Sequence, residues 1–288
     1  MIDASVLTIV KGRRPHLENQ LRGLEQSIVS PKEWVIVGMD EDPPQLESAH
    51  FPIRLGRVNS SGQGEIPLAQ ARNRAASLAS SPLLVFLDVD CIPSPGLMET
   101  FGRVIADSPQ LWMGTIGYLP PDAASRDWTF DDLAGKAIEH PLLPKLDGAD
   151  CLSSDRYELF WSLNFAIPAE LFSRIGGFDE NYAGYGAEDT DFAFMAREQG
   201  IPFGFAAARA YHQHHAVCKP PLNHFRSILI NAERFRQKWG LWPMEKWLRQ
   251  FDELGLIDFN ANSNELAILK DPTESQIREA TVNTPAGF

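Results

Sequence analysis

Positions 83–90 read LLVFLDVD, which is five apolar residues followed by two aspartates one residue apart. A short apolar run of this kind is typical of a strand buried on both faces of a parallel sheet. Asp88 and Asp90 then follow its carboxyl end, where open α/β sheets bind ligands. Two such carboxylates can hold Mg²⁺ or Mn²⁺ and leave positions on the ion for phosphate oxygens. On its own, an Asp-x-Asp triplet is more often a solvated turn.

Outward from this strand, apolar runs alternate with segments of helical periodicity. This alternation predicts an α/β protein with a mostly parallel central sheet flanked by helices, and it puts Asp40, which follows the second strand, on the same rim as Asp88. Asn59–Glu65 reads as a loop, and the polar last dozen residues are expected to fray. The predicted strands are Ser5–Val10, Trp34–Val37, Ile53–Val58, Leu163–Ile167 and Pro202–Ala207, and the predicted helices include Leu68–Ala79, Ala169–Ile175 and Asp189–Gln199.

The composition narrows the classes of partner. The chain has 288 residues, 44% of them hydrophobic, and a net charge of −12. Such an acidic protein is a poor candidate for binding nucleic acid, which draws on clustered Lys and Arg. A nucleotide diphosphate would also be repelled unless a divalent cation bridged it to the protein.

The sequence carries no targeting signal that we can identify. The N-terminus leads straight into a predicted strand, and no apolar run approaches the ~18 residues of a membrane span. Three cysteines without regular spacing do not suggest a disulfide framework. These features predict a cytoplasmic protein without a transmembrane segment, and leave peripheral membrane contact open.

A second acidic cluster begins a predicted helix, where positions 184–191 read GYGAEDTD. Acidic residues in a first turn are favoured by the helix dipole, which is a sufficient structural explanation. The approach to the helix suggests more, because Tyr185 stands between two glycines and offers a stacking face to a ligand. A carboxylate here could accept a proton from a substrate hydroxyl.

A histidine cluster follows the last predicted strand, where positions 211–218 read YHQHHAVC. One histidine could complete the shell of the Asp-x-Asp metal. Alternatively, His212, one of His214 and His215, and Cys218 could hold zinc, or the histidines could simply be surface residues. Spacing alone does not choose between these readings. A further open case is Arg72, which is either a solvated helix residue or a phosphate ligand.

Taken in order, these motifs resemble the family 2 glycosyltransferases with the GT-A fold, and the later half resembles their galactosyltransferase-like branch. The resemblance covers roughly residues 4–215. It implies a nucleotide-sugar-binding half at 1–120, an acceptor-binding half at 121–215 and a helical C-terminal extension at 216–288 that carries no assigned motif. The matching segments are Ala71–Ala75, Phe86–Asp90, Asn164–Pro168, Gly176–Glu180 and Gly184–Asp189.

The resemblance implies the following donor side. Asp90, assisted by Asp88, would bind Mn²⁺ or Mg²⁺, and His212 would complete the metal shell, with His214 close enough to compete. The nucleotide-sugar would also be held by Asp40 at the nucleobase and by Arg72 near the base or diphosphate.

The resemblance also implies an inverting transfer from a nucleotide diphosphate sugar, of the UDP and galactose type, to a carbohydrate or other hydroxyl acceptor. Asp189 would be the general base, and Glu188 would act beside it by binding the acceptor. Further acceptor contacts would come from Tyr185, Gly186 and Asp191. Tyr185 departs from the animal galactosyltransferases, which carry Trp there, so the acceptor is the least defined part.

Three other readings remain open on the sequence. A sugar-phosphate nucleotidyltransferase would use a similar sheet, but its glycine-rich loop after the first strand is missing. A non-catalytic sugar-binding protein would be expected to lack the acidic residues, which are present. The third is a zinc hydrolase built on the histidines. No P-loop and no Gly-x-Ser-x-Gly elbow occurs.

Overall fold

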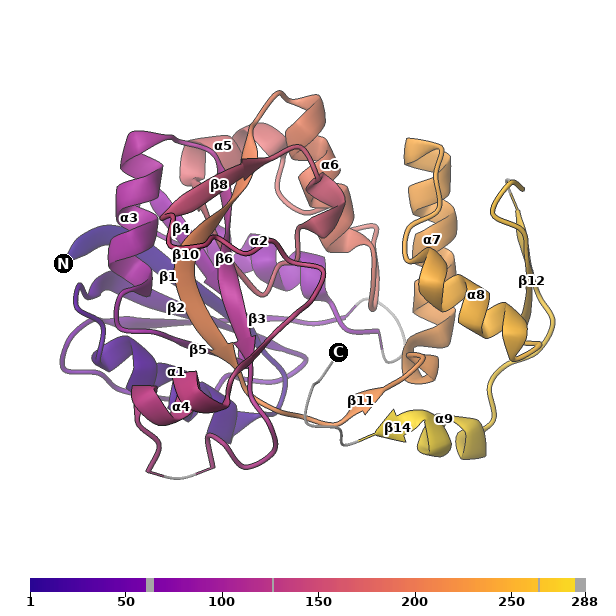
Figure 1. Cartoon of the computed structure of the whole chain (residues 1–288), viewed down its shortest axis with the longest axis horizontal. Helices are drawn as coiled ribbons and strands as arrows, with labels where there is room; N and C mark the ends of the chain where they lie inside the picture. The colour runs from indigo at the N-terminus through magenta and orange to yellow at the C-terminus, as the bar shows by residue number, and fades with distance from the viewer. Residues whose placement is uncertain (61–64, 126, 264, 283–288) are drawn as a thin grey trace.

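A computed structural model describes residues 1–60, 65–125, 127–263 and 265–282 (Figure 1). Its centre is one large sheet. The strands follow each other across it in the order β3 (Ile53–Val58), β2 (Pro31–Met39), β1 (Ile2–Val10), β4 (Leu83–Leu87), β9 (Asn164–Pro168), β6 (Leu111–Tyr118), β10 (Phe203–His212) and β5 (Cys91–Pro93). Two short strands join at the side, β7 (Ile138–Glu139) on β6 and β8 (Cys151–Ser154) on β10.

The sheet is mostly parallel, as the sequence predicts. Strands β3, β2, β1 and β4 pair in parallel, and so do β6 and β10. Strand β9 is antiparallel to both of its neighbours, and β5 is antiparallel to β10. All five residues of β4 are buried, which explains why this central strand reads as an uninterrupted apolar run.

Alternate residues of the central strands pack into two hydrophobic cores. Leu7 and Ile9 face one core, which contains side chains of α2 (Leu68–Leu78), α5 (Ala169–Ile175) and α6 (Glu188–Glu198). Val6 and Val10 face the other, which contains side chains of α1 (Arg14–Glu25) and α3 (Leu97–Asp107). This alternation follows from the period of two along a strand.

The C-terminal quarter of the chain forms a helical unit with its own core (Figure 1). In Figure 1 this unit lies at the right, on the side of the molecule opposite the N-terminus. Its helices are α7 (Phe225–Trp239), α8 (Glu245–Glu253) and α9 (Glu274–Ala280), and its strand pairs are β11 (Val217–Cys218) with β14 (Thr281–Val282) and β12 (Ile257–Phe259) with β13 (Leu266–Ile268). The remaining elements are α4 (Phe130–Lys136) and two 3₁₀ turns, Tyr157–Leu159 and Leu222–His224.

Two segments that the sequence predicts to be irregular are only partly described. The expected fraying of the last dozen residues is wrong as far as residue 282, because α9 and β14 occupy that part, and residues 283–288 lie outside the described residues. Residues 61–64 of the predicted loop Asn59–Glu65 also lie outside them. Within the described ranges, we find no helix with the length and apolar character that crossing a bilayer would require.

Candidate functional site

The turn after β4 is held by a buried glutamine from α1. Gln20 is fully buried, and its Nε2 donates to the carbonyl oxygens of Asp88 and Cys91, at 2.8 Å each. The hydroxyl of Thr8 in β1 donates to Oε1 of Gln20 at 2.8 Å and fixes the amide. The backbone of the Asp-x-Asp turn is therefore tied to β1 and α1, which gives Asp90 a defined direction.

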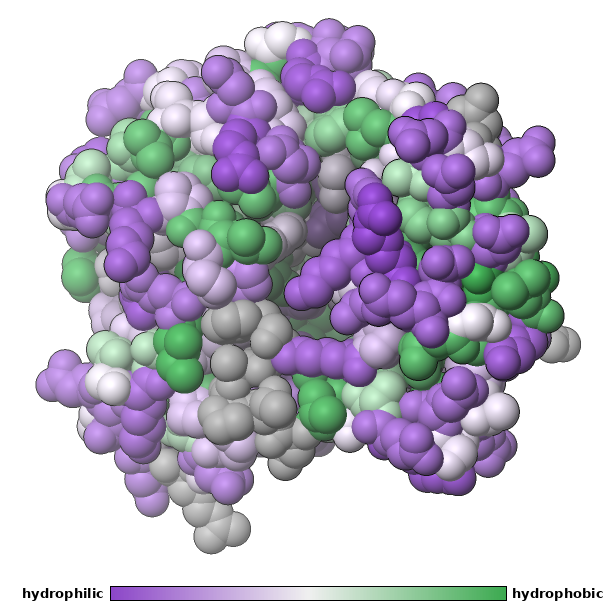
Figure 2. Space-filling model, turned by 45° about the vertical axis from the view of Figure 1, so that its right-hand side comes forward, coloured by the Kyte–Doolittle hydropathy of each residue, from purple (hydrophilic) through white to green (hydrophobic). Residues whose placement is uncertain are grey.

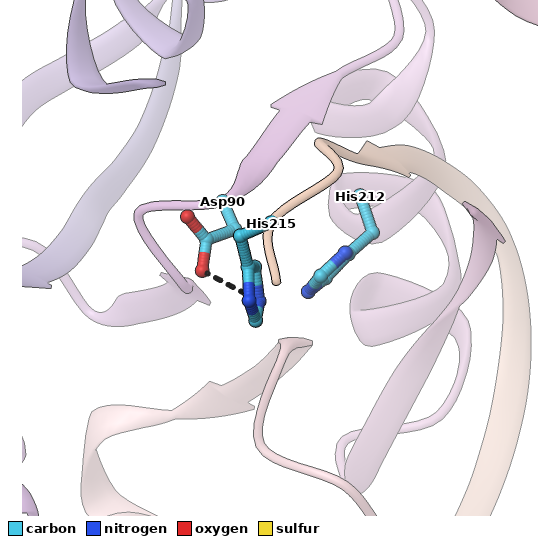
Figure 3. Close-up of side chains that lie close together, drawn as sticks. All are labelled: Asp90, His212 and His215. Atoms are coloured by element: carbon cyan, nitrogen blue, oxygen red, sulfur yellow. Dashed lines mark ion pairs between the residues drawn. The ribbon is translucent and has the colours of Figure 1, made fainter. Parts of the chain in front are cut away.

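The side chain of Asp90 points toward two histidines at the end of β10 (Figure 3). Cys91 pairs with His212 where β5 runs antiparallel to β10, and the N–H of Gln213 donates to the Asp90 carbonyl at 2.6 Å. One ligand atom from each of Asp90, His212 and His215 lies within 4.8 Å of the other two. Asp90 is only 4% exposed, and its Oδ2 lies 3.5 Å from Nε2 of His215.

Two residues at the start of α1 also contact this carboxylate: Arg13, which immediately precedes the helix, and His16 in its first turn. Arg13 forms an ion pair with Oδ2 of Asp90, and Nδ1 of His16 lies 2.6 Å from Oδ1. Burial, helped by nearby cationic groups, lowers the pKa of His16 to about 4 and that of His212 to about 3. Both imidazoles are therefore neutral at pH 7 and offer a lone pair, the form in which histidine binds metals.

The cluster of Asp90, His212 and His215 fits a divalent transition cation. A carboxylate oxygen with two imidazole nitrogens suits Mn²⁺ or Zn²⁺ better than Mg²⁺, which prefers oxygen ligands. The structure thus brings together the predicted ligands Asp90 and His212. The third side chain is His215 and not His214, which the resemblance implied as a competing ligand, and Asp88 is not among the three clustered side chains.

The alternative zinc site with Cys218 gains no support among the described residues. The thiol of Cys218 lies 3.2 Å from the carbonyl oxygen of Pro220 and 3.8 Å from that of Ile277. It therefore faces the C-terminal helical unit, and it is not part of the histidine cluster.

The acidic start of α6 contains a buried ion pair. Nη1 of Arg72 lies 3.0 Å from Oε1 of Glu188, and the two residues are only 6% and 5% exposed. Next to them, burial and the charge of Glu188 raise the pKa of Asp189 to about 7. A carboxylate with this pKa is matched to proton transfer near neutral pH. The structure therefore places Arg72 beside the predicted acceptor carboxylates, and its predicted contact with the donor stays a prediction.

Asp191, the third carboxylate of this run, is fully buried. Its oxygens accept hydrogen bonds from the hydroxyl of Tyr182 at 3.1 Å, from Nζ of Lys238 at 2.9 Å and from Nε1 of Trp239 at 2.7 Å. These contacts dock α6 on α7, and they leave little of the carboxylate for the acceptor contact that the resemblance implied.

Asp40 lies at the carboxyl end of β2, on the rim where the sequence predicts it. Nζ of Lys11 donates to Oδ2 at 2.7 Å, and the N–H of Ser60 donates to Oδ1 at 2.6 Å. These two bonds lower the pKa of Asp40 to about 2, so that it is ionised at any physiological pH. The loop that carries Arg13 is joined to the same strand end, because the N–H of Gly12 donates to Glu41.

Three residues around the metal cluster were not predicted from the sequence, namely Arg13, His16 and Gln20, and His215 was named only in the alternative zinc site. One signal was available, since Arg13 lies three residues after the end of the predicted strand Ser5–Val10 and so belongs on the ligand rim. The pairing of His16 with Asp90 joins residues 74 positions apart, and no local pattern encodes it.

Known proteins resemble this chain in sequence. A family model described as the N-terminal domain of galactosyltransferase matches residues 149–216. The validoxylamine A glucosyltransferase of Streptomyces hygroscopicus subsp. limoneus is 26% identical over 273 residues, covering 81% of this chain and 56% of the relative. The chain thus spans about half the length of the curated relatives it matches.

Solved structures resemble it in fold. S. aureus TarS 1-349 in complex with UDP-GlcNAc has a TM-score of 0.55 at 14% identity, covering 82% of this chain and 67% of that one. GalNAc-T7 with UDP, GalNAc and Mn²⁺ has a TM-score of 0.53 at 14% identity, covering 87% and 56%. The α/β fold of GT-A type and the resemblance to family 2 glycosyltransferases are therefore confirmed.

Proposed function

We propose that this chain is an inverting, metal-dependent glycosyltransferase that moves a hexose from a nucleotide diphosphate sugar to a hydroxyl acceptor. The observation that carries the proposal is that the turn bearing the candidate metal ligand Asp90 and the helix start bearing the candidate base Asp189 both lie near Tyr185. The loss of water around its hydroxyl raises the pKa of Tyr185 most, and the charges of Glu188, Asp189 and Asp88 raise it further. The Asp-x-Asp turn and the start of α6 are thus within electrostatic reach of one side chain.

On the donor side, Asp90, His212 and His215 would hold Mn²⁺, with Asp88 close to the diphosphate. When bound, the cation would neutralise the diphosphate and stabilise the charge that develops on it as it leaves. The Mn²⁺ complex of the GalNAc-T7 relative supports this choice of ion. Asp40, ionised by its two hydrogen bonds, would accept from a nucleobase N–H.

On the acceptor side, Asp189 would remove the proton from the attacking hydroxyl. The acceptor oxygen forms a bond to the anomeric carbon while the bond from that carbon to the diphosphate oxygen breaks, and the bonding pair leaves with the diphosphate. Attack from the face opposite the leaving group inverts the anomeric centre. Glu188, fixed by Arg72, would accept a hydrogen bond from a further hydroxyl of the acceptor.

The donor is proposed to be a UDP-sugar. The solved relatives contain UDP or UDP-GlcNAc, which supports the nucleotide. The hexose is less defined, because the matching family model is described as a galactosyltransferase domain and the curated relative as a glucosyltransferase. Both UDP-galactose and UDP-glucose therefore belong in the first test.

The test is the release of UDP from a panel of UDP-galactose, UDP-glucose and UDP-GlcNAc, with Mn²⁺ and with excess EDTA. We expect Mn²⁺-dependent release with at least one donor, and NMR of the transferred product should show the inverted anomer. Release of pyrophosphate from a sugar 1-phosphate and UTP would support a nucleotidyltransferase instead. A retained anomer would contradict the role of Asp189.

A further inference from the structure

The C-terminal helical unit is hydrogen-bonded to the loop that leads into α6. Asn231 of α7 is fully buried, and its Nδ2 donates to the carbonyl oxygens of Ala183 and Gly186, at 3.0 Å each, with Tyr185 at 3.4 Å. The hydroxyl of Ser227 in the same helix accepts from the N–H of Tyr185 at 3.2 Å. The conformation of this loop is therefore set from α7, a helix outside the segments that carry the recognised motifs.

The two glycines of the loop show how closely the contact is built. A Cβ on Gly184 would lie 2.4 Å from the Cβ of Ser227, and a Cβ on Gly186 would lie 2.7 Å from the sulfur of Met244. Both glycines have positive φ, at 78° and 100°. Only glycine satisfies both the space and the backbone conformation here, so the loop is shaped to fit the C-terminal unit.

Two aromatic side chains of that unit meet Tyr185. The ring of His224 stacks on Tyr185 with centroids 4.6 Å apart and an interplanar angle of 22°. The indole of Trp247 in α8 follows at 6.0 Å and 28°. Tyr185 is 37% exposed, and His224 and Trp247 are half-buried, so the group keeps aromatic surface that the fold does not cover.

The aromatic group lies next to the reacting region. Tyr185 precedes Glu188 by three residues, and its hydroxyl is within electrostatic reach of Glu188, Asp189 and Asp88. Figure 2 shows a hollow near the middle of the molecule, with hydrophilic side chains along its right-hand side. An acceptor bound at Asp189 would therefore lie close to Tyr185.

We propose that Tyr185, His224 and Trp247 form the acceptor subsite, and that it binds a hydroxylated six-membered ring, a pyranoside or cyclitol, through the apolar face of that ring. This inference rests on the proposed glycosyl transfer. The C–H groups on one face of such a ring pack on aromatic surface, while its hydroxyls reach the carboxylates of Glu188 and Asp189. The C-terminal unit then selects the acceptor, and the sheet domain holds the donor.

The experiment separates the donor from the acceptor. Calorimetry with UDP and Mn²⁺ tests the donor side. Transfer from the active UDP-sugar to methyl pyranosides and myo-inositol, compared with the acyclic polyols glycerol and sorbitol, tests the acceptor side. We expect the parent protein to use the ring acceptors and to discriminate against the acyclic ones. Lack of UDP binding would instead contradict the proposed function itself.

The decisive variants are Trp247→Ala, His224→Ala and Trp247→Phe. We expect the two alanine changes to raise the KM for the ring acceptor about tenfold, a factor within the range of aromatic contacts. UDP affinity and the rate of donor hydrolysis should stay within about twofold, and Trp247→Phe should keep most of the acceptor affinity.

The matched control is Trp242→Phe, a tryptophan in the core of the same unit whose ring packs on Phe259 and not on Tyr185. It should lower the melting temperature without changing the acceptor KM. If Trp247→Ala and His224→Ala leave the acceptor KM unchanged, the aromatic group only packs the unit on the loop. The same conclusion follows if the parent binds UDP and hydrolyses the donor but transfers to none of the ring acceptors.

Discussion

Arg13 and Asp90 form an ion pair at the carboxyl rim of the sheet, although they are 77 positions apart in the sequence. The guanidinium contacts Oδ2 of Asp90, the oxygen that also faces Nε2 of His215 at 3.5 Å. A cation bound by these side chains would therefore compete with Arg13 for the same oxygen. Once displaced, the guanidinium would be free to bind the phosphate of the donor.

This competition predicts an unusual effect for Arg13→Met. Removal of the guanidinium should tighten the binding of Mn²⁺ alone, because Asp90 loses its competing partner. Binding of UDP in the presence of Mn²⁺ should weaken, because a phosphate contact is lost. Calorimetry measures both affinities. Arg14→Met is the control, since Arg14 is exposed and pairs with Glu18; weaker binding of Mn²⁺ alone in Arg13→Met would contradict the prediction.

The histidine cluster predicts that His215 contributes more to metal binding than His214. His215 has a ligand atom within 4.8 Å of those of Asp90 and His212, and His214 is not in this group. His215→Ala should lower Mn²⁺ affinity about tenfold or more, and His214→Ala should change it about twofold at most. Titration of the apo protein with Mn²⁺, followed by electron paramagnetic resonance, distinguishes the two. The opposite order would restore the assignment suggested by the sequence.

The sequence predicted those parts of the site that short segments encode. The run LLVFLDVD gave both a buried strand and its acidic end, and the glycine-rich approach to α6 marked Glu188 and Asp189. The contacts of Asp90 with Arg13 and His16 could not be predicted from local sequence, because they depend on β1 and β4 lying side by side in the sheet.

Two further elements that were not predicted do show local patterns in the sequence. Helix α3 buries Leu97, Met98, Phe101 and Val104, and this helical spacing is visible in the sequence. Strand β6 buries every residue except Thr115, and its start, Leu111–Met113, is a short apolar run. The hydrogen bonds from Asn231 to the Gly-Tyr-Gly loop could not be predicted in this way, because no local pattern in either segment indicates them.

Arg72 should control the pH at which Asp189 becomes active. Its positive charge lowers the pKa of Asp189, against the raising effects of burial and of Glu188. In Arg72→Gln, that pKa should rise further, so the acid limb of kcat should move to higher pH. The melting temperature should also fall, because Glu188 is left buried without its partner.

The control for Arg72→Gln is Arg74→Gln, which changes an exposed arginine on the same helix and should leave the pH profile in place. A profile of kcat against pH between 5 and 9 decides the matter. An unchanged acid limb in Arg72→Gln would mean that a different group titrates in turnover.

Replacement of Asp189 by Asn tests the general base, because Asn is close in shape but cannot take a proton. Turnover should fall by ~10²-fold or more, while UDP affinity with Mn²⁺ stays within about twofold.

The pKa of Asp189 rises from 3.8 to about 7 on folding. Between these pH values the folded protein therefore holds a proton that the unfolded chain has released. Stability of the parent must then fall as pH rises from about 4 to 7, since the charged form is disfavoured in the fold. Asp189→Asn lacks this loss and should melt at a higher temperature than the parent at pH 8, with a difference that shrinks toward pH 4. Glu198→Gln, at the exposed far end of α6, should show neither effect. Full turnover in Asp189→Asn would move the base to Glu188, and an unchanged pH dependence of melting would show that Asp189 is ionised in the folded protein.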